Sequence, residues 1–244
     1  MCDLHQFTVD APTPLGSIPD QIRQALAGSD QNGWVKLYNS GNFFDPRSIP
    51  PDDYREIAEL CTPFERIIVE NHPRFGGRRM QRFQKFLRQP LEVAVGLESV
   101  QPRWLARMQK KMTRDDFDQY ASELHRQSAD LRVFLIVGVP GVTVAEAIRW
   151  ARLSVRHAVR CGARHISLIP ARRGNGWGNS IDPLPQLSLD DWQEMQRAAI
   201  QDADGAASVT IDLWDFESEN PQMERLREVN LSQQPDPKTH AVEH

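Results

Sequence analysis

Short apolar runs alternate along this chain with longer segments in which apolar residues recur at helical spacing. The apolar runs predict six strands, over residues 34–39, 66–71, 91–99, 131–141, 165–170 and 208–216. The other segments predict helices over residues 18–27, 50–60, 78–88, 143–161 and 188–203, with one or two more within 103–128. Because the predicted strands are continuous apolar runs, we expect both faces of the sheet to be covered and the strands to be mostly parallel.

Two of the predicted helices carry local start and stop signals. Thr143 and Glu146 have the spacing of a capping box, and Gly162 stands where a glycine commonly ends a helix. Ser188 is likewise followed three residues later by an acid, Asp191. These signals predict where the helices after residues 142 and 187 begin.

The alternation of strands and helices fits two closures of a parallel sheet: an open doubly wound sheet, or a barrel or partial barrel. Periodicity does not choose between them. In both closures, ligands bind at the carboxyl ends of the strands, so functional residues are expected in the loops that follow the strands. Those loops cover residues 39–46, 70–77, 97–103, 137–143 and 169–180.

Composition limits the setting of the protein. Of the 244 residues, 40% are hydrophobic and 25% are charged, and the net charge of -4 gives no general attraction to nucleic acid or membranes. No apolar run approaches the roughly 20 residues that span a bilayer, and no signal-like start is present, so we expect a cytoplasmic protein. With no linker before residue 219, residues 1–218 predict one domain and residues 219–244 a polar tail.

The cysteines are Cys2, Cys61 and Cys161. Their odd number and wide spacing argue against a disulfide framework. Cys61 and Cys161 fall within or just after predicted helices, and we interpret them as small buried hydrophobic residues. Cys2 either has no function or ends a longer cysteine motif, and the residues alone leave both alternatives open.

Several loop residues are candidates for ligand binding. Glu70 and Glu98 each end a predicted strand, so they either carry out acid–base chemistry, hold a ligand's hydroxyl and amine groups, or are solvated surface acids. The glycine-rich loops 138–141 and 174–179 lack dinucleotide and P-loop fingerprints, although glycine lets a ligand approach the backbone. The basic residues within 74–88 either bind RNA or phosphate, or form the solvated side of a helix.

Seven segments in order along nearly the whole chain resemble the radical S-adenosylmethionine (SAM) superfamily, and within it the Fe–S oxidoreductase branch that includes the archaeosine synthase beta-subunit-like proteins. They are MCDLHQFTVDAPTPLGSIPDQI, VKLYNSGNFFDP, IIVENHP, LEVAVGLES, VPGVTVAEAI, ISLIPARRGNGW, and VTIDLWDFE with VNLSQQ. The resemblance implies an α/β fold, a partial (β/α)6 TIM-like barrel, whose first loop carries C-x3-C-x2-C. Its three thiolates would hold a [4Fe–4S] cluster with one iron open for SAM. Reductive cleavage of SAM would start radical chemistry on a small-molecule or RNA substrate, with an electron-donor protein as partner.

The resemblance also assigns residues to the cofactors. Cys2 matches the third cysteine of the cluster motif, Glu98 lies where the family contacts ribose, and Glu70 is a further cofactor-binding candidate. The loop expected at the methionine end of SAM is Ser40, Gly41 and Asn42, with Asn42 in place of the usual acid. The residues expected around the adenine are Gly138, Gly141, Ile169 and Pro170.

Two features depart from the family pattern. The first two cysteines are expected three and seven residues before Cys2, ahead of Met1, together with the first strand of the barrel. The C-x2-C of this branch, expected after the last strand, is replaced by ESENPQM. If the first strand is missing, strand 34–38 becomes an exposed edge that is prone to pair with another chain.

Three functions follow from these observations. If Met1 is an internal methionine, the complete gene product is a radical SAM enzyme and this chain is truncated within the cysteine motif. Otherwise the chain is a degenerate, non-catalytic barrel that binds a SAM-like ligand or a protein partner. A third alternative is an acid–base enzyme that uses Glu70 and Glu98 without any cluster.

Overall fold

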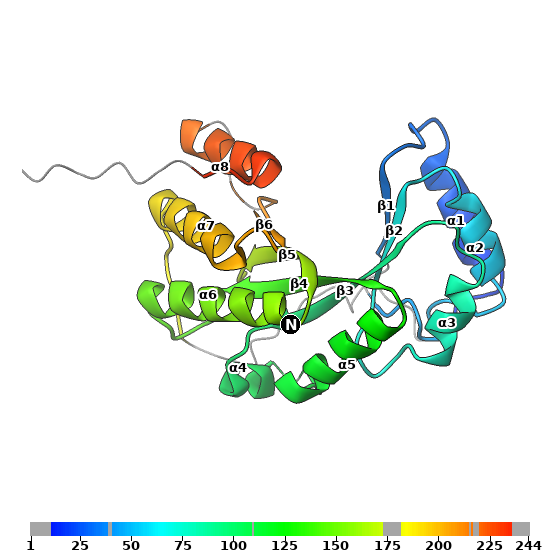
Figure 1. The fold of residues 1–244 in the computed structure, drawn as a ribbon, viewed down its shortest axis with the longest axis horizontal. Coiled ribbons are helices and arrows are strands. Elements are labelled where there is room, and N and C mark those ends of the chain that lie inside the picture. Colours follow the sequence, from blue (N-terminus) through cyan, green and yellow to red (C-terminus); the bar gives the residue numbers. More distant parts are fainter. Residues whose placement is uncertain are drawn as a thin grey trace, which may run out of the picture.

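The computed structural model describes residues 11–38, 41–108, 110–172, 182–214, 216 and 220–235. Six parallel strands form one sheet in sequence order and curl into a half-barrel (Figure 1). The strands are β1 (Trp34–Leu37), β2 (Arg66–Glu70), β3 (Leu91–Glu98), β4 (Asp130–Val137), β5 (Ala163–Pro170) and β6 (Ser208–Ile211). The helices are α1 (Ser17–Leu26), α2 (Tyr54–Leu60), α3 (Arg78–Gln84), α4 (Pro102–Arg107), α5 (Arg114–Arg126), α6 (Val144–Arg160), α7 (Leu189–Ala203) and α8 (Pro221–Ser232). The expected partial (β/α)6 barrel is confirmed, while a further strand ahead of residue 1 stays a prediction.

Local signals account for the helix bounds. The capping boxes at Thr143 and Ser188 are both formed, and Gly162 follows α6 with a φ of 82°. A third capping box at Thr113 separates α4 from α5. The predicted helix 50–60 is shorter than expected, because it begins at Tyr54 after a turn in which the carboxylate of Asp53 accepts from the backbone of Gly16.

The two faces of the sheet differ in chemistry. Alternate strand residues such as Val93, Val133 and Leu135 are fully buried in the core formed with the helices on the convex face. The positions between them in β3, β4 and β5 include Glu92, Arg132 and His165, and Glu92 contacts both of the others. The half-barrel therefore has an apolar convex face and a concave face that mixes charged with apolar side chains.

Helix α8 lies in the segment predicted from the sequence to be a polar tail. It buries Met223, Leu226 and Val229 and contacts α7 and β6. The sequence signal for this helix is weak, because these three apolar positions stand in a polar segment. The division of the chain into domains stays a prediction.

The two edges of the sheet are finished differently. At β6, the side-chain amide of Asn230 accepts from Ile211 N at 2.8 Å and donates to Ile211 O at 2.9 Å. Gln233 makes the same pair with Val209, at 2.7 and 3.1 Å. At the other edge, β1 pairs with β2 alone among the described strands. Pairing of β1 with another chain stays a prediction.

In the part of the chain that the structure describes, no helix is both long and apolar enough to cross a bilayer.

Candidate ligand-binding site

Most of the predicted site residues come to one end of the half-barrel. Asn42, Glu70 and Glu98 follow or end β1, β2 and β3, while Gly138 and Pro170 follow or end β4 and β5. Because all six strands are parallel, these positions share the carboxyl-end edge of the sheet, which we call the mouth. Cys2 and Ser40 lie outside the described residues.

The loop after β1 is held against the end of β2. Phe43 N donates to Glu70 O at 2.9 Å, and the side chain of Asn42 accepts from His72 N at 2.8 Å. Phe43 and the following Phe44 are fully buried, which anchors the loop. The Asn42 oxygen thus positions this loop, next to Gly41, rather than pointing at a ligand.

Glu70 is the least satisfied acid at the mouth. Its carboxylate has no hydrogen-bond or ion-pair partner among the residues that the structure describes, although the residue is half-buried. Desolvation by burial raises the pKa of Glu70 to about 7. Tyr38 lies within electrostatic reach of Glu70, and burial raises the pKa of this phenol to about 12. A half-buried carboxyl group that titrates near neutrality fits proton transfer or binding of a cationic group.

Glu98 is held by a local irregularity of β3. The pairing of β3 with β4 shifts register between Gly96 and Glu98, and Glu98 has a φ of 63°. Its carboxylate accepts from Lys110 Nζ at 2.6 Å. A Cβ at Gly96 would lie 2.3 Å from the Glu98 Oε1 and 2.9 Å from Nζ of Lys110, so a larger residue there would displace the ends of these two flexible side chains. Lys110 was not identified from the sequence, because it lies twelve positions beyond Glu98 in an irregular segment.

A pocket of about 210 Å³ opens at the ends of β4 and β5. Gly138 and Pro170 both line it, while their contact with a ligand stays a prediction. Its other lining residues are Val137, Ala171, Leu184, Pro185, Gln186, Leu187, Trp192 and Phe216. Gly138 has a φ of 82°, and a Cβ there would lie 3.2 Å from Pro185, so the pocket wall depends on glycine.

The other two residues predicted around the adenine do not line this pocket. Gly141 is exposed, and its N–H donates to Pro183 O at 3.0 Å. Ile169 is half-buried and alternates with Leu168, which lies in the convex core. Their contact with a ligand stays a prediction.

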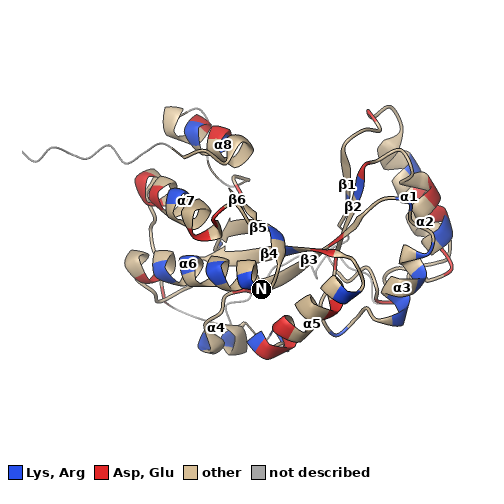
Figure 2. Cartoon of the chain, viewed as in Figure 1, with Lys and Arg blue, Asp and Glu red and all other residues tan. Residues whose placement is uncertain are grey.

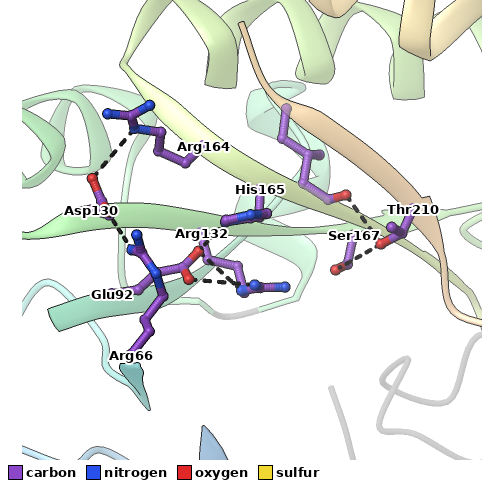
Figure 3. A network of polar contacts seen from close by, with 9 residues as sticks. Arg66, Glu92, Asp130, Arg132, Arg164, His165, Ser167 and Thr210 are labelled. Atoms are coloured by element: carbon purple, nitrogen blue, oxygen red, sulfur yellow. Dashed lines mark hydrogen bonds and ion pairs between the residues drawn. The ribbon is translucent and has the colours of Figure 1, made fainter. Parts of the chain in front are cut away.

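The amino-end half of the concave face carries a buried ion cluster that the sequence did not predict. Glu92 is fully buried and accepts from His165 at 2.5 Å, and Arg132 Nε lies 3.2 Å from the same carboxylate oxygen (Figure 3). Desolvation raises the pKa of Glu92, but the His165 hydrogen bond and the Arg132 charge outweigh it and hold the pKa below its ordinary value. Charged residues inside apolar strands were the sequence signal for this cluster.

A second set of charges lies beside it. Asp130 pairs with Arg66 from β2 and with Arg164 at 3.4 Å (Figure 3). Farther along, Ser167 and Thr210 share a hydrogen bond of 3.4 Å between β5 and β6. The amino-end half of the face therefore carries a network of ion pairs and hydrogen bonds, in which the Nε of Arg132 is buried without a hydrogen-bond partner among the described residues.

The predicted basic run lies on and beside α3, on the helical side of the molecule. Figure 2 shows the basic residues of α3 next to the mixed charges of α1 and α2. Within the run, Arg82 pairs with Asp52 at 2.7 Å and Arg79 donates to Phe44 O at 3.3 Å. Arg74, Arg78 and Arg88 are exposed. Contact with RNA stays a prediction.

The two described cysteines lie away from the mouth. Cys61 is fully buried in the core just before β2, and burial raises its pKa to about 12. Cys161 is only half-buried and follows α6 just before β5, beside Asp118 and His157. Its interpretation as an ordinary buried residue is therefore incomplete.

Comparisons with known proteins identify the fold class. The chain is an α/β half-barrel whose fold resembles several solved structures, and no family model matches it. Structures of Streptococcus suis SuiB, one of them bound to S-adenosylmethionine, match with a TM-score of 0.59 and 10% identity, over 87% of this chain. Methylornithine synthase (PylB) matches with a TM-score of 0.57 and 10% identity, over 89% of this chain and 72% of that chain. Elp3 from Methanocaldococcus infernus matches with a TM-score of 0.51 and 12% identity, over 88% of this chain and 58% of that one.

One curated relative matches in sequence. It is the uncharacterized protein MJ0550 of Methanocaldococcus jannaschii, which is 23% identical over 142 residues, covering 56% of this chain and 39% of that protein. The chain covers 49% and 48% of the two SuiB chains, so it spans about half the length of SuiB. At these identities the structural likenesses show a shared fold.

Proposed function

We propose that this chain is a radical SAM-type protein that binds SAM at the mouth of the half-barrel. The observation that carries the proposal is that Gly41, Glu98, Gly138 and Pro170, which the sequence resemblance assigns to SAM, lie at the same edge of the sheet. The fold shared with SuiB, which has been solved with SAM bound, supports it.

The described residues fit parts of the cofactor. Pockets that hold a whole small ligand have volumes of roughly 300–1,000 Å³. The 210 Å³ pocket beside Gly138 therefore suits one ring system, and its mostly apolar wall fits an adenine. The carboxylate of Glu98 is oriented by Lys110 and is suited to accept hydrogen bonds from ribose hydroxyls. When bound and reductively cleaved at an iron–sulfur cluster, SAM supplies hydrogen-abstracting radical chemistry.

The described thiols do not fit the cluster. Three thiolates at one loop are required, whereas Cys61 lies in the core and Cys161 lies beside the end of α6. Cys2 is the cysteine that the resemblance assigns to the cluster, and it is outside the described residues. No step through a cluster is assigned to the described residues.

The finer parts of the proposal concern the reaction. Reductive cleavage of SAM at a [4Fe–4S] cluster ligated by Cys2 is supported by the resemblance to the archaeosine synthase beta-subunit-like branch. A modified RNA nucleoside as substrate is supported only by the exposed arginines around α3. A cytoplasmic setting and an electron-donor protein complete this proposal.

A second candidate is a half-barrel that binds a SAM-like ligand without radical chemistry. The placement of Cys61 and Cys161 away from the mouth favours it. The acid–base alternative is favoured by Glu70, which has no described partner and a pKa of about 7. Glu98 is a weaker candidate for that chemistry, because Lys110 already occupies its carboxylate.

Calorimetric titration of the protein with SAM tests the binding proposal. Ala171 lines the pocket, so Ala171→Phe should fill it and weaken SAM binding by about tenfold or more, or about 1.4 kcal/mol. The matched control is Ala206→Phe. Ala206 is exposed in the turn before β6, at the amino ends of the strands and therefore at the end of the half-barrel opposite to the mouth. This variant should leave the affinity unchanged.

The outcomes separate the candidates. Absence of SAM binding by the folded wild-type protein would contradict both the radical SAM proposal and the SAM-like binder. If Ala171→Phe binds SAM as tightly as the wild-type protein, the SAM site lies outside the pocket. Anaerobic reconstitution with iron and sulfide then divides the first two, because only the radical enzyme should gain a cluster absorbance.

A further inference from the structure

Outside the mouth, α5 and α6 bring three metal-binding side chains together. The donor atoms of Asp118, His157 and Cys161 all lie within 4.8 Å of one another. His157 and Cys161 are four residues apart at the end of α6, so their side chains project from the same face of one helix. Asp118 reaches them from the first half of α5, 39 residues earlier in the chain.

The distances are close to those of a tetrahedral metal site. Zinc bonds of about 2.3 Å to sulfur and about 2.0–2.1 Å to nitrogen or oxygen place tetrahedral ligand atoms about 3.3–3.6 Å apart. Cys161 Sγ lies 3.4 Å from Asp118 Oδ1 and 3.7 Å from His157 Nε2. The remaining distance, from His157 Nε2 to Asp118 Oδ1, is 2.6 Å and reflects a hydrogen bond. Opening that hydrogen bond by less than 1 Å is the main adjustment needed.

The surroundings favour a cation. The cluster lies at the carboxyl end of α6, where the helix dipole and unpaired carbonyls carry partial negative charge. Asp118 adds a carboxylate whose side chain is 41% exposed, whereas the His157 side chain is only 12% exposed. A metal can therefore enter from solvent at Asp118, while His157 is shielded and Cys161 is half-buried. Arg160 is the opposing charge near Cys161.

We propose that Asp118, His157 and Cys161 bind a zinc ion, with a water molecule as the fourth ligand. One carboxylate, one imidazole and one thiolate form a mixed donor set that suits Zn²⁺ better than the hard cations Mg²⁺ or Ca²⁺. The ion cross-links α5 to α6. It lies near the start of β5, at the amino ends of the strands, whereas the mouth lies at their carboxyl ends. The proposed zinc site is therefore independent of SAM and of any cluster at Cys2.

Titration with Co²⁺, a spectroscopic substitute for Zn²⁺, tests this site in the metal-stripped protein under anaerobic conditions. Thiolate ligation should give a near-ultraviolet charge-transfer band, and Zn²⁺ should remove it by competition. The band should be lost in Cys161→Ala and strongly reduced in His157→Ala and Asp118→Asn. It should persist in the matched cysteine controls Cys2→Ala and Cys61→Ala.

Zinc protection of the native thiol provides a second measurement that does not depend on the folding of a variant. Zn²⁺ should slow alkylation of Cys161 in the wild-type protein, as followed by mass spectrometry of its peptide, and should raise the melting temperature. Unchanged alkylation at saturating Zn²⁺ would overturn the proposal and leave a hydrogen-bonded trio. A cobalt band that survives in Cys161→Ala but disappears in Cys2→Ala would also overturn it.

Discussion

The two ends of the concave face are built in opposite ways. At the amino ends of the strands, Glu92 contacts both Arg132 and His165, so a buried charge is fully compensated. At the mouth, Glu70 is half-buried without a described partner, and Glu98 is held at a φ of 63°. Acids at the amino end therefore have charged partners, whereas at the mouth one acid has no described partner and another has a strained backbone.

This difference agrees with the separate roles that the two ends of the strands have in barrel folds. Residues at the amino ends of barrel strands serve stability, whereas those at the carboxyl ends serve binding and catalysis. Backbone strain and a raised carboxyl pKa lower stability, and they persist where function retains them. We therefore expect substitutions at the two ends to separate stability from binding.

The largest effect is expected for Glu92→Ala. Removing this carboxylate leaves Arg132 and His165 without compensation, and loss of one partner of a buried ion pair costs about 3–5 kcal/mol. Urea unfolding followed by circular dichroism measures the change. The control is Asp52→Ala, which removes an exposed partner of Arg82 and should cost less than about 1 kcal/mol. Equal costs for the two variants would contradict the comparison.

A change in pH dependence is expected for Glu70→Gln. The folded pKa of Glu70, about 7, lies above the unfolded value of about 4.3, so the folded state binds this proton more tightly. That stabilisation is complete below about pH 4 and is lost as the pH rises through 7. Relative to wild type, Glu70→Gln should therefore gain roughly 1–3 kcal/mol between pH 4 and pH 8.

Unfolding free energies measured across this pH range test the expectation. The control Glu59→Gln, at an exposed position of α2, should run parallel to wild type. A Glu70→Gln curve that is also parallel to wild type would show that Glu70 is solvated at the mouth.

The smallest effect is expected at Glu98. Glu98→Ala and Glu98→Gly both remove the contact with Lys110, but only glycine adopts a positive φ without strain. Glu98→Gly should therefore be more stable than Glu98→Ala by about 1 kcal/mol, after the greater flexibility of unfolded glycine is counted. The same urea experiment measures the difference, and a less stable Glu98→Gly would contradict strain at this position.

The features that were predictable from the sequence are encoded locally. A capping box such as that of Thr143 needs only four consecutive residues, and an apolar run marks a strand by itself. The ion cluster needs strand register, because Glu92 and His165 are 73 residues apart. The hydrogen bonds of Asn230 to β6 likewise depend on tertiary packing, which a polar tail sequence does not reveal.

For the candidate site, the sequence predicted which residues share one end of the sheet, but it did not predict which of them line the same pocket. The ends of parallel strands must share an edge, so Glu70, Glu98, Gly138 and Pro170 were expected together. Whether a residue lines a given pocket depends on the loop that closes it, and Leu187 closes this one from a segment far along the chain. For that reason Gly141 and Ile169 were assigned to the same ligand as Gly138 but lie outside its pocket.

The amide groups of α8 have a consequence for self-association. Asn230 and Gln233 already occupy the backbone groups that β6 would offer to another strand. A sheet with two open edges can add chains indefinitely and grow into a fibre, whereas a sheet that is blocked on one side stops after one addition. Among the described strands, β1 is the edge left to pair, so if copies of this protein associate through strand edges, we expect the association to stop at two copies, joined β1 to β1 about a twofold axis.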